Sequence, residues 1–201
     1  MAKRSPLALA VLALLSEAPM HPYRMQQLLT LRGKDQVVNV SQRASLYATI
    51  DRLTRDGLVE VRETIREGHR PERSVYQITD AGRSAAHGWM VEMLSSPRPD
   101  FPEFHAALSH LPLLEPAEAT ELLRRRHRHL AAAIEGMRGQ LAAERDTLPR
   151  LLLLDNELIL AVHETELRWL DTVLADLGSG AMTWTPETLA DLSRKFDPPA
   201  T

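Results

Sequence analysis

The chain has 201 residues, of which 44% are hydrophobic and only 4% aromatic, a composition that permits a buried core and favours long helices over many short strands. It holds no cysteine, which excludes disulfides and thiolate chemistry and makes the cytoplasm the expected location, and no apolar run approaches the roughly 18–20 residues of a membrane span. The net charge of −3 is unevenly distributed, because residues 1–88 carry 13 Lys and Arg against 9 Asp and Glu, whereas residues 89–201 carry 11 against 18. Only the first part therefore has the positive charge that suits contact with phosphates.

The first predicted helix covers residues 5–16 and is apolar on nearly every side, so we expect it to be buried. Two basic residues followed by the apolar run 7–15 also resemble the start of a secretory signal. The pair Ser5-Pro6 favours a structural helix, because serine caps a helix and proline is tolerated in its first turn.

A second helix is predicted for residues 22–32 and a third for residues 41–56, where Gly57 ends it. The inward stripe of the third helix is expected to be Leu46, Tyr47, Ile50 and Leu53. The opposite face would carry small, polar and basic groups with no carboxylate at its centre, namely Ser41, Ala44, Ser45, Ala48, Arg52 and Arg55. Such a face can approach DNA closely.

Alternating apolar residues then predict two strands, at residues 58–66 and 74–78, joined by a basic turn as a β-hairpin. Thr79-Asp80 is typical of the start of a fourth helix, which would extend to about residue 94. Three helices followed by a basic hairpin are the arrangement of a winged helix-turn-helix domain, which recognises the major groove of DNA.

The proline-rich segment 97–102 is the expected boundary between a domain at residues 1–96 and a domain at residues 97–201. The expected fold class is mostly α. An N-terminal winged helix-turn-helix domain, with three helices plus a β-hairpin wing, would be joined to a C-terminal all-α dimerisation domain of long antiparallel helices.

In the second domain, a short helix near 104–111 would precede long helices at 116–146 and 149–177 and a last helix at 186–196. The long pair would form an antiparallel hairpin with more apolar surface than one partner helix covers. We expect a second copy of the chain to cover the surplus, through Leu151, Leu154, Leu158, Val162, Trp169 and Leu170.

Several stretches resemble the PadR family of bacterial transcriptional regulators. Residues 18–23 look like that family's entry to the second helix, residues 45–47 and 57–59 are similar to its recognition helix and wing start, and residues 70–82 resemble its second wing strand. A weaker similarity within 101–184 is to the longer C-terminal domain of one branch. The resemblance implies a winged-helix head, a dimer built by C-terminal helices, and repression that a small molecule relieves.

The residues predicted to contact DNA come from the third helix and the wing: Gln42, Arg43, Ser45, Tyr47, Arg52, Arg70 and Arg73. For Tyr47 the alternative is core packing, and for the wing arginines it is a solvated surface. A candidate effector pocket for a small aromatic or apolar ligand lies near the domain junction, at Trp89, Met93, Phe101 and Phe104. The alternative is that these four side chains only pack that junction.

No phosphate loop, nucleophile motif or metal-ligand spacing is present, so we predict no enzyme activity, no metal and no cofactor. The basic run 124–129 is expected to pair with Glu118, Glu121 and an acidic partner helix, with a second DNA patch as the alternative. The predicted function is that of a homodimeric regulator that binds operator DNA. The competing hypothesis is a protein-interaction module that uses the long apolar helices and whose winged helix does not bind DNA.

Overall fold

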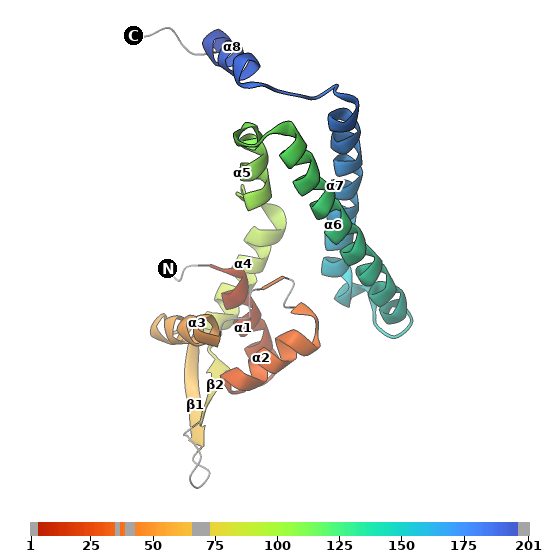
Figure 1. Cartoon of the computed structure of the whole chain (residues 1–201). Coiled ribbons are helices and arrows are strands. Elements are labelled where there is room, and N and C mark those ends of the chain that lie inside the picture. Colours follow the sequence, from red (N-terminus) through yellow and green to blue (C-terminus); the bar gives the residue numbers. More distant parts are fainter. Residues whose placement is uncertain (1–3, 35–36, 39–42, 66–72, 197–201) are drawn as a thin grey trace, which may run out of the picture. The chain divides into compact units, whose positions relative to one another are not determined.

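The computed structural model describes residues 4–34, 37–38, 43–65 and 73–196. The chain divides into two compact units, Met1–Pro99, here called the head, and Asp100–Thr201, here called the helical unit. The described elements of the head are α1 (Pro6–Glu17), α2 (Pro22–Leu31), α3 (Arg43–Arg55), β1 (Val59–Ile65), β2 (Arg73–Ile78) and α4 (Asp80–Ser95), as labelled in Figure 1. Those of the helical unit are α5 (Glu103–Ser109), η2 (Leu111–Leu113), α6 (Pro116–Arg145), η3 (Arg150–Leu152), α7 (Leu154–Ser179) and α8 (Pro186–Phe196). The predicted mostly α fold with a two-stranded wing is confirmed.

Helix α1 forms the centre of the head. Its Val11 and Leu12 side chains are fully buried, and the helix packs against α3, α4 and β2. Ser5 caps its first turn, since the hydroxyl oxygen accepts a hydrogen bond from the Ala8 amide at 3.2 Å. The prediction of a buried structural helix at residues 5–16 is confirmed.

The wing consists of β1 and β2, which pair antiparallel with Val59 opposite Ile78 and an irregularity between Val61 and Glu63. The turn between α1 and α2 pairs with β2 through an isolated β-bridge. The Met20 amide donates to the Tyr76 carbonyl at 3.1 Å, and the Tyr76 amide donates to the Met20 carbonyl at 3.0 Å. These two bonds hold the start of α2 against the wing (Figure 1).

A carboxylate and a guanidinium join the ends of α1 and α2. Arg32 donates two hydrogen bonds to Glu17, at 2.6 and 2.7 Å. The Arg32 guanidinium thereby holds the pKa of the Glu17 carboxyl below its usual range. Both side chains remain exposed, so the pair orients the two helices while contributing little to stability.

The start of α4 is fixed against the end of α3. Thr79 caps α4 by accepting from the Gly82 amide at 3.0 Å, and its hydroxyl donates to the Gly57 carbonyl at 2.8 Å. Gly57 has a φ of 72°, the left-handed conformation that lets the chain leave α3 and enter β1. Gly82 is buried, because α4 lies directly against the backbone of Leu58.

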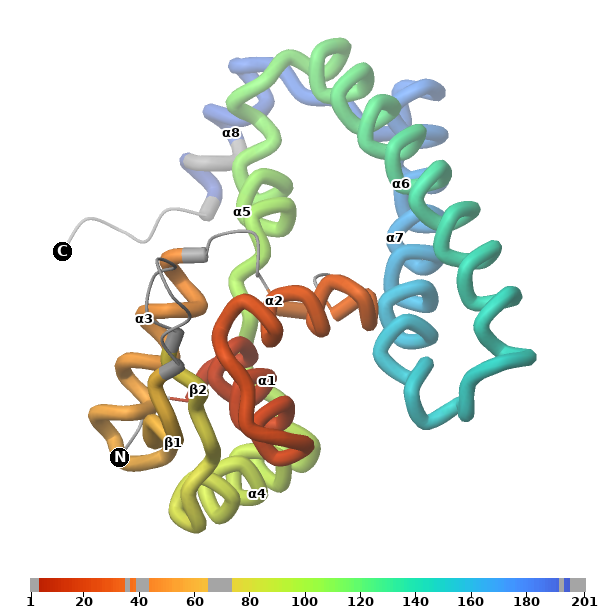
Figure 2. Tube along the Cα trace, turned by 90° about the horizontal axis from the view of Figure 1, so that it is seen from below, coloured from red at the N-terminus to blue at the C-terminus, as the bar shows by residue number. Residues whose placement is uncertain are grey.

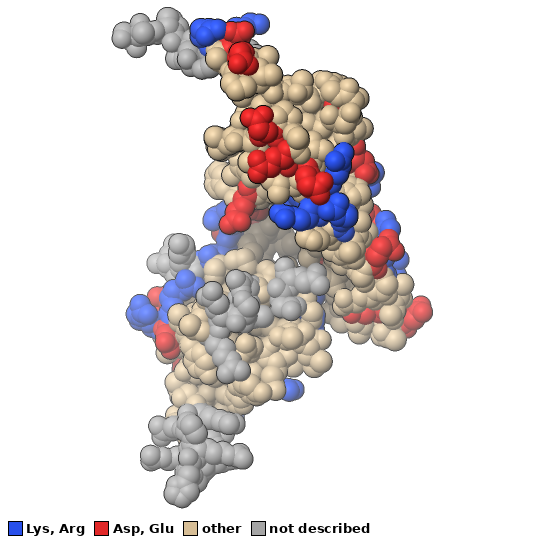
Figure 3. Space-filling model, viewed as in Figure 1, with Lys and Arg blue, Asp and Glu red and all other residues tan. Residues whose placement is uncertain are grey.

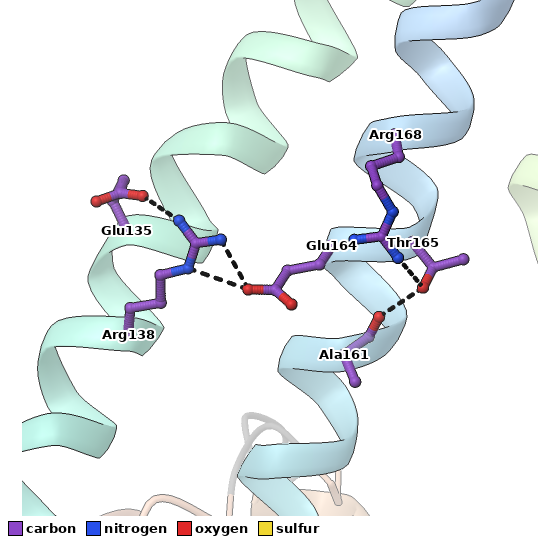
Figure 4. A network of polar contacts seen from close by, with 6 residues as sticks. All are labelled: Glu135, Arg138, Ala161, Glu164, Thr165 and Arg168. Carbon is purple, nitrogen blue, oxygen red and sulfur yellow. Dashed lines mark hydrogen bonds and ion pairs between the residues drawn. The ribbon is translucent and has the colours of Figure 1, made fainter.

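In the helical unit, α6 and α7 lie side by side as an antiparallel hairpin, seen from two directions in Figures 1 and 2. Apolar contacts at Leu123, Ile134 and Leu170 close its inner face. Along the edge, Arg138 of α6 donates to Glu164 of α7 at 2.8 and 3.0 Å and to Glu135 at 2.7 Å (Figure 4). The Arg138–Glu164 pair joins the two helices, whereas Arg138–Glu135 lies within α6.

Four members of the basic run 124–129 contact carboxylates of Glu121 and α7, as predicted, whereas the predicted pairing with Glu118 is not found among the described residues. Glu121 contacts Arg124 at 4.0 Å and Arg128 at 3.4 Å. On α7, Glu166 contacts Arg126 at 2.6 Å and Asp171 contacts His127 at 2.7 Å. On the face seen in Figure 3, acidic and basic side chains of the helical unit lie in adjacent patches. Among the helices that the structure describes, none is both long and apolar enough to cross a membrane.

Candidate nucleic-acid interface

The outward face of α3 is the candidate DNA-binding surface of the head. Leu46, Ile50 and Leu53 point inward as predicted, but the fourth member of the inward stripe is Thr49, which is 8% exposed. Tyr47 was expected there and is instead 48% exposed. The reason is helical geometry, because positions 46, 49, 50 and 53 follow the i, i+3, i+4, i+7 spacing of a single face.

With Thr49 turned inward instead of Tyr47, a carboxylate lies on the outward face of α3. Among residues 44–55 of α3, the exposed ones are Ala44, Tyr47, Ala48, Asp51 and Arg55. The prediction that no carboxylate lies at the centre of this face was therefore wrong, since Asp51 lies between Tyr47 and Arg55 around the helix. Had Thr49 been assigned to the inward stripe, the sequence would have predicted Asp51 on the outward face. Its carboxylate is able to accept a hydrogen bond from a cytosine amino group.

Tyr47 and Asp51 are neighbours of Tyr76 on β2. Burial raises the pKa of the Tyr76 hydroxyl, and the negative charge of Asp51 raises it further, against a lowering effect of the hydrogen bond with Ser74. The exposure of Tyr47 excludes the alternative that this residue serves only core packing.

Arg52 and Ser45 lie at the flank of α3, and both are partly buried. The Arg52 guanidinium reaches inward, with Nη2 3.4 Å from the Ser5 hydroxyl oxygen, while its Nε is buried without a hydrogen-bond partner among the described residues. Arg52 therefore contacts the cap of α1. A substitution there would disturb folding as well as any contact with DNA.

The remaining predicted DNA contacts lie at the ends of elements. Arg43 is the first residue of α3, and Arg73 is the first residue of β2, paired with Ile65. Gln42 and Arg70 lie outside the described residues.

The four candidate effector residues are divided between the two units. Trp89 and Met93 belong to α4, where Trp89 packs against the core of the head and Met93 is 37% exposed. Phe101 is 92% exposed. Phe104, on α5, contacts the edge of the Trp169 ring, with ring centroids 6.2 Å apart.

Five of the six predicted dimerisation residues form an exposed apolar stripe along α7 and the turn before it: Leu151, Leu154, Leu158, Val162 and Trp169. Leu170 departs from that prediction. Its side chain is fully buried against α6, because it faces the inside of the hairpin and not its outer surface. Within the described part of the chain, no group of three His, Asp or Glu side chains is close enough to hold a metal ion.

The helix pair α2 and α3, the exposed face of α3 and the wing define the head as a winged helix-turn-helix domain. Residues 11–88 match the model of the Transcriptional regulator PadR-like family. The resemblance inferred from the sequence is thereby confirmed over residues 11–88.

A curated relative, the negative transcriptional regulator PadR of Bacillus subtilis, is 24% identical over 99 residues. That match covers 49% of this chain and 54% of the relative, so the chain spans about half the length of the curated protein that it matches.

Solved structures share the fold over most of the chain. Bacillus subtilis PadR in complex with operator DNA superposes with a TM-score of 0.68 at 20% identity, covering 85% of this chain and 98% of that one. The same protein with p-coumaric acid gives 0.67 at 19% identity over 87% and 99%. The Vibrio cholerae virulence activator AphA gives 0.65 at 21% identity over 86% and 98%.

Proposed function

We propose that this protein is a homodimeric transcriptional regulator that binds operator DNA through its head, in the cytoplasm. The observation that carries the proposal is the exposed face of α3 beside a wing, in a segment that matches the PadR-like family. The structural similarity to a PadR bound to operator DNA supports it. The net positive charge of residues 1–88 also supports it, because contacts with the negatively charged phosphates dominate affinity for DNA.

In the proposed complex, α3 enters the major groove with its exposed face toward the bases. Arg43, Ser45 and Tyr47, together with Gln42, contact bases and phosphates from the start of α3, and Arg70 and Arg73 contact the backbone from the wing. Asp51 joins this group as a residue that the structure adds. Arg52 contributes chiefly by holding α3 against the cap of α1, through its contact with Ser5.

The experiment that tests DNA binding is a salt titration with the duplex upstream of the protein's own gene. A dimer that neutralises several phosphates should lose affinity steeply, by roughly 10³-fold or more between 50 and 200 mM salt for six or more contacts. Affinity that hardly changes with salt would contradict the proposed phosphate contacts. Absence of binding at low salt would favour the competing hypothesis, a protein-interaction module.

The dimer is proposed to form along the exposed stripe of α7. A monomer that leaves five large apolar side chains of one stripe in water exposes the kind of patch that marks an interface. Two heads joined in this way would reach successive major grooves, roughly 34–36 Å apart.

Leu158→Glu is expected to break this dimer, because Leu158 is 66% exposed at the middle of the stripe and its burial by a partner contributes about 1.5–3 kcal/mol. Because both subunits carry the change, the dissociation constant should rise roughly 10²- to 10⁴-fold in sedimentation equilibrium. Ala175→Glu adds the same charge on another exposed side of α7 and is the control. An unchanged dimer in the Leu158 variant would overturn the assignment of the stripe.

We further propose that the regulator is a repressor whose DNA binding a small ligand weakens. The complex of Bacillus subtilis PadR with p-coumaric acid supports regulation of this kind. By linkage, such a ligand must bind the DNA-incompetent state better, and couplings of about 1–3 kcal/mol are typical. Trp89, Met93, Phe101 and Phe104 remain the residues that the sequence nominates for its pocket.

A further inference from the structure

An apolar groove of about 400 Å³ lies entirely within the helical unit. It is formed by α5, η2 and the first part of α6, and its lining is nearly all apolar: Phe104, Leu108, Leu111, Leu114, Leu122 and Leu123. Leu113, which also lines it, is 85% exposed. No described residue of α8 lies in the groove, so this apolar surface faces water in the single chain.

Helix α8 carries an apolar face that needs a partner. Its sequence places Leu189, Leu192 and Phe196 at the spacing i, i+3, i+7 of a single face, with its charged residues away from that face. Among the described residues, no other helix or strand packs closely against α8. A helix of 11 residues is marginal in water when nothing covers its apolar face. The stability of α8 therefore requires a surface to bind.

The chain enters α8 at the edge of the groove and in a fixed direction. The Trp184 indole donates to the Leu114 carbonyl at 2.8 Å, which anchors the chain beside a residue of the groove. The Thr188 amide then donates to the Thr185 hydroxyl at 3.2 Å, and the Thr185 amide donates to the Thr188 hydroxyl at 2.8 Å. This reciprocal cap fixes the start of the helix. Because only Thr185 separates the anchor from α8, the helix has little freedom to turn back onto the groove of its own chain.

The groove adjoins the stripe of α7 through which the dimer is proposed to form. Phe104 in the groove wall contacts Trp169 of the stripe edge-on, with ring centroids 6.2 Å apart. An interface along α7 is therefore continuous with the groove.

The exposed stripe alone is small for a stable dimer. Its five side chains expose on the order of 500 Å² per chain, whereas standard interfaces bury about 800 Å² per partner. An amphipathic helix that lies in an apolar groove is a recurrent way of adding such area. Both halves of that contact, the helix and the groove, belong to this one chain.

We propose that α8 of each copy lies in the groove of the other copy, so that the two chains of the dimer exchange their last helices. The inference rests on the homodimer proposed above and adds a second contact to it. The apolar face of α8 covers the leucines of the groove, while its charged residues stay in water. Two-fold symmetry makes the contact occur twice in each dimer.

Engineered cysteine pairs report which copy α8 contacts, because the chain has no cysteine of its own. Leu189→Cys on one chain and Leu122→Cys on a second, tagged chain are coexpressed and treated with a short bismaleimide. Exchange predicts a covalent dimer that contains one chain of each kind. Ala142→Cys takes the place of Leu122→Cys in the control and should give no such dimer, because residue 142 is exposed on α6 roughly 30 Å further along the helix.

A chain that carries both Leu189→Cys and Leu122→Cys separates exchange from folding back. Exchange predicts covalent dimers that are linked twice. A crosslink within one chain, without covalent dimer, would show that α8 occupies its own groove and would contradict the proposal. Absence of both kinds of crosslink would overturn it as well.

Substitutions in α8 measure how much the exchange contributes to the dimer. Leu189→Glu should raise the dissociation constant of the dimer roughly 100-fold or more in sedimentation equilibrium, because an apolar contact is lost twice. Ala190→Glu adds the same charge at an exposed position away from the apolar face and should leave the dimer unchanged. Equal losses in the two variants, or no loss in either, would argue against the helix contact.

Failure of this inference and failure of the proposed function give different results. A stable dimer of the parent protein without the mixed crosslink would refute the exchange and leave the proposed regulator in place. A parent protein that is monomeric would refute the proposed dimer together with the exchange. The salt titration with operator DNA tests the head independently of both.

Discussion

Replacing Gly82 by alanine is expected to destabilise the head by about 3 kcal/mol or more. A Cβ at this position would lie 2.1 Å from the Leu58 carbonyl oxygen and 2.7 Å from the Ile78 side chain. The first of these atoms belongs to the backbone, so relief requires α4 to move away from the junction of α3 and β1. Thr79 anchors the same junction through Gly57, which prevents a small local adjustment.

Gly88 gives the matched control, because it lies in the same helix with nothing within 4 Å of its Cβ position. Gly88→Ala should stabilise α4 by about 0.5–1 kcal/mol, the usual gain of alanine over glycine inside a helix. Amide hydrogen exchange of α1 in the full chain measures both effects on the head, separately from the helical unit. Slower or unchanged exchange in Gly82→Ala would show that α4 does not pack as described.

Ala48→Glu is expected to reduce operator affinity roughly 100-fold or more, about 2.7 kcal/mol, without unfolding the head. Ala48 is exposed in the middle of α3, on the face proposed to enter the major groove. A glutamate there lengthens the side chain where the helix must approach the bases and places a second carboxylate beside Asp51. Repulsion from the phosphates adds to the steric effect.

Ala142→Glu makes the same substitution at an exposed position of α6 and should leave operator affinity unchanged. Fluorescence anisotropy with a labelled operator compares the two variants, and circular dichroism verifies that both keep their helices. Operator affinity equal to that of the parent in the Ala48 variant would remove α3 from the interface. A loss of the same size in both variants would indicate an effect of net charge alone.

The local elements were predictable because their signals are local. The Ser5-Pro6 and Thr79-Asp80 pairs mark helix starts, Gly57 marks the end of α3, and alternating apolar residues mark the wing. Each depends on the conformational preferences of a few neighbouring residues. The class of the head follows from their order along the chain, and the family resemblance adds DNA as the expected partner.

The exposed surfaces were predicted less well, because they depend on how far each helix is rotated about its axis. The bulky side chain of Tyr47 suggests an inward position in sequence, whereas in the structure Thr49 is buried and Asp51 is exposed. Leu158 and Leu170 are equally apolar, yet α6 covers Leu170 and leaves Leu158 in water. Helical spacing favours Thr49 over Tyr47, but no local pattern distinguishes Leu158 from Leu170.

By itself, the sequence determined the winged head, the pair of long helices and the basic character of the first 88 residues, because periodicity, capping and charge are properties of short segments. Only the tertiary structure decided which residues occupy the face of α3, and that Phe104, Leu111 and Leu122 line one groove. These residues come from three separate elements. Their proximity is a result of packing between distant parts of the chain, for which one sequence carries no local signal.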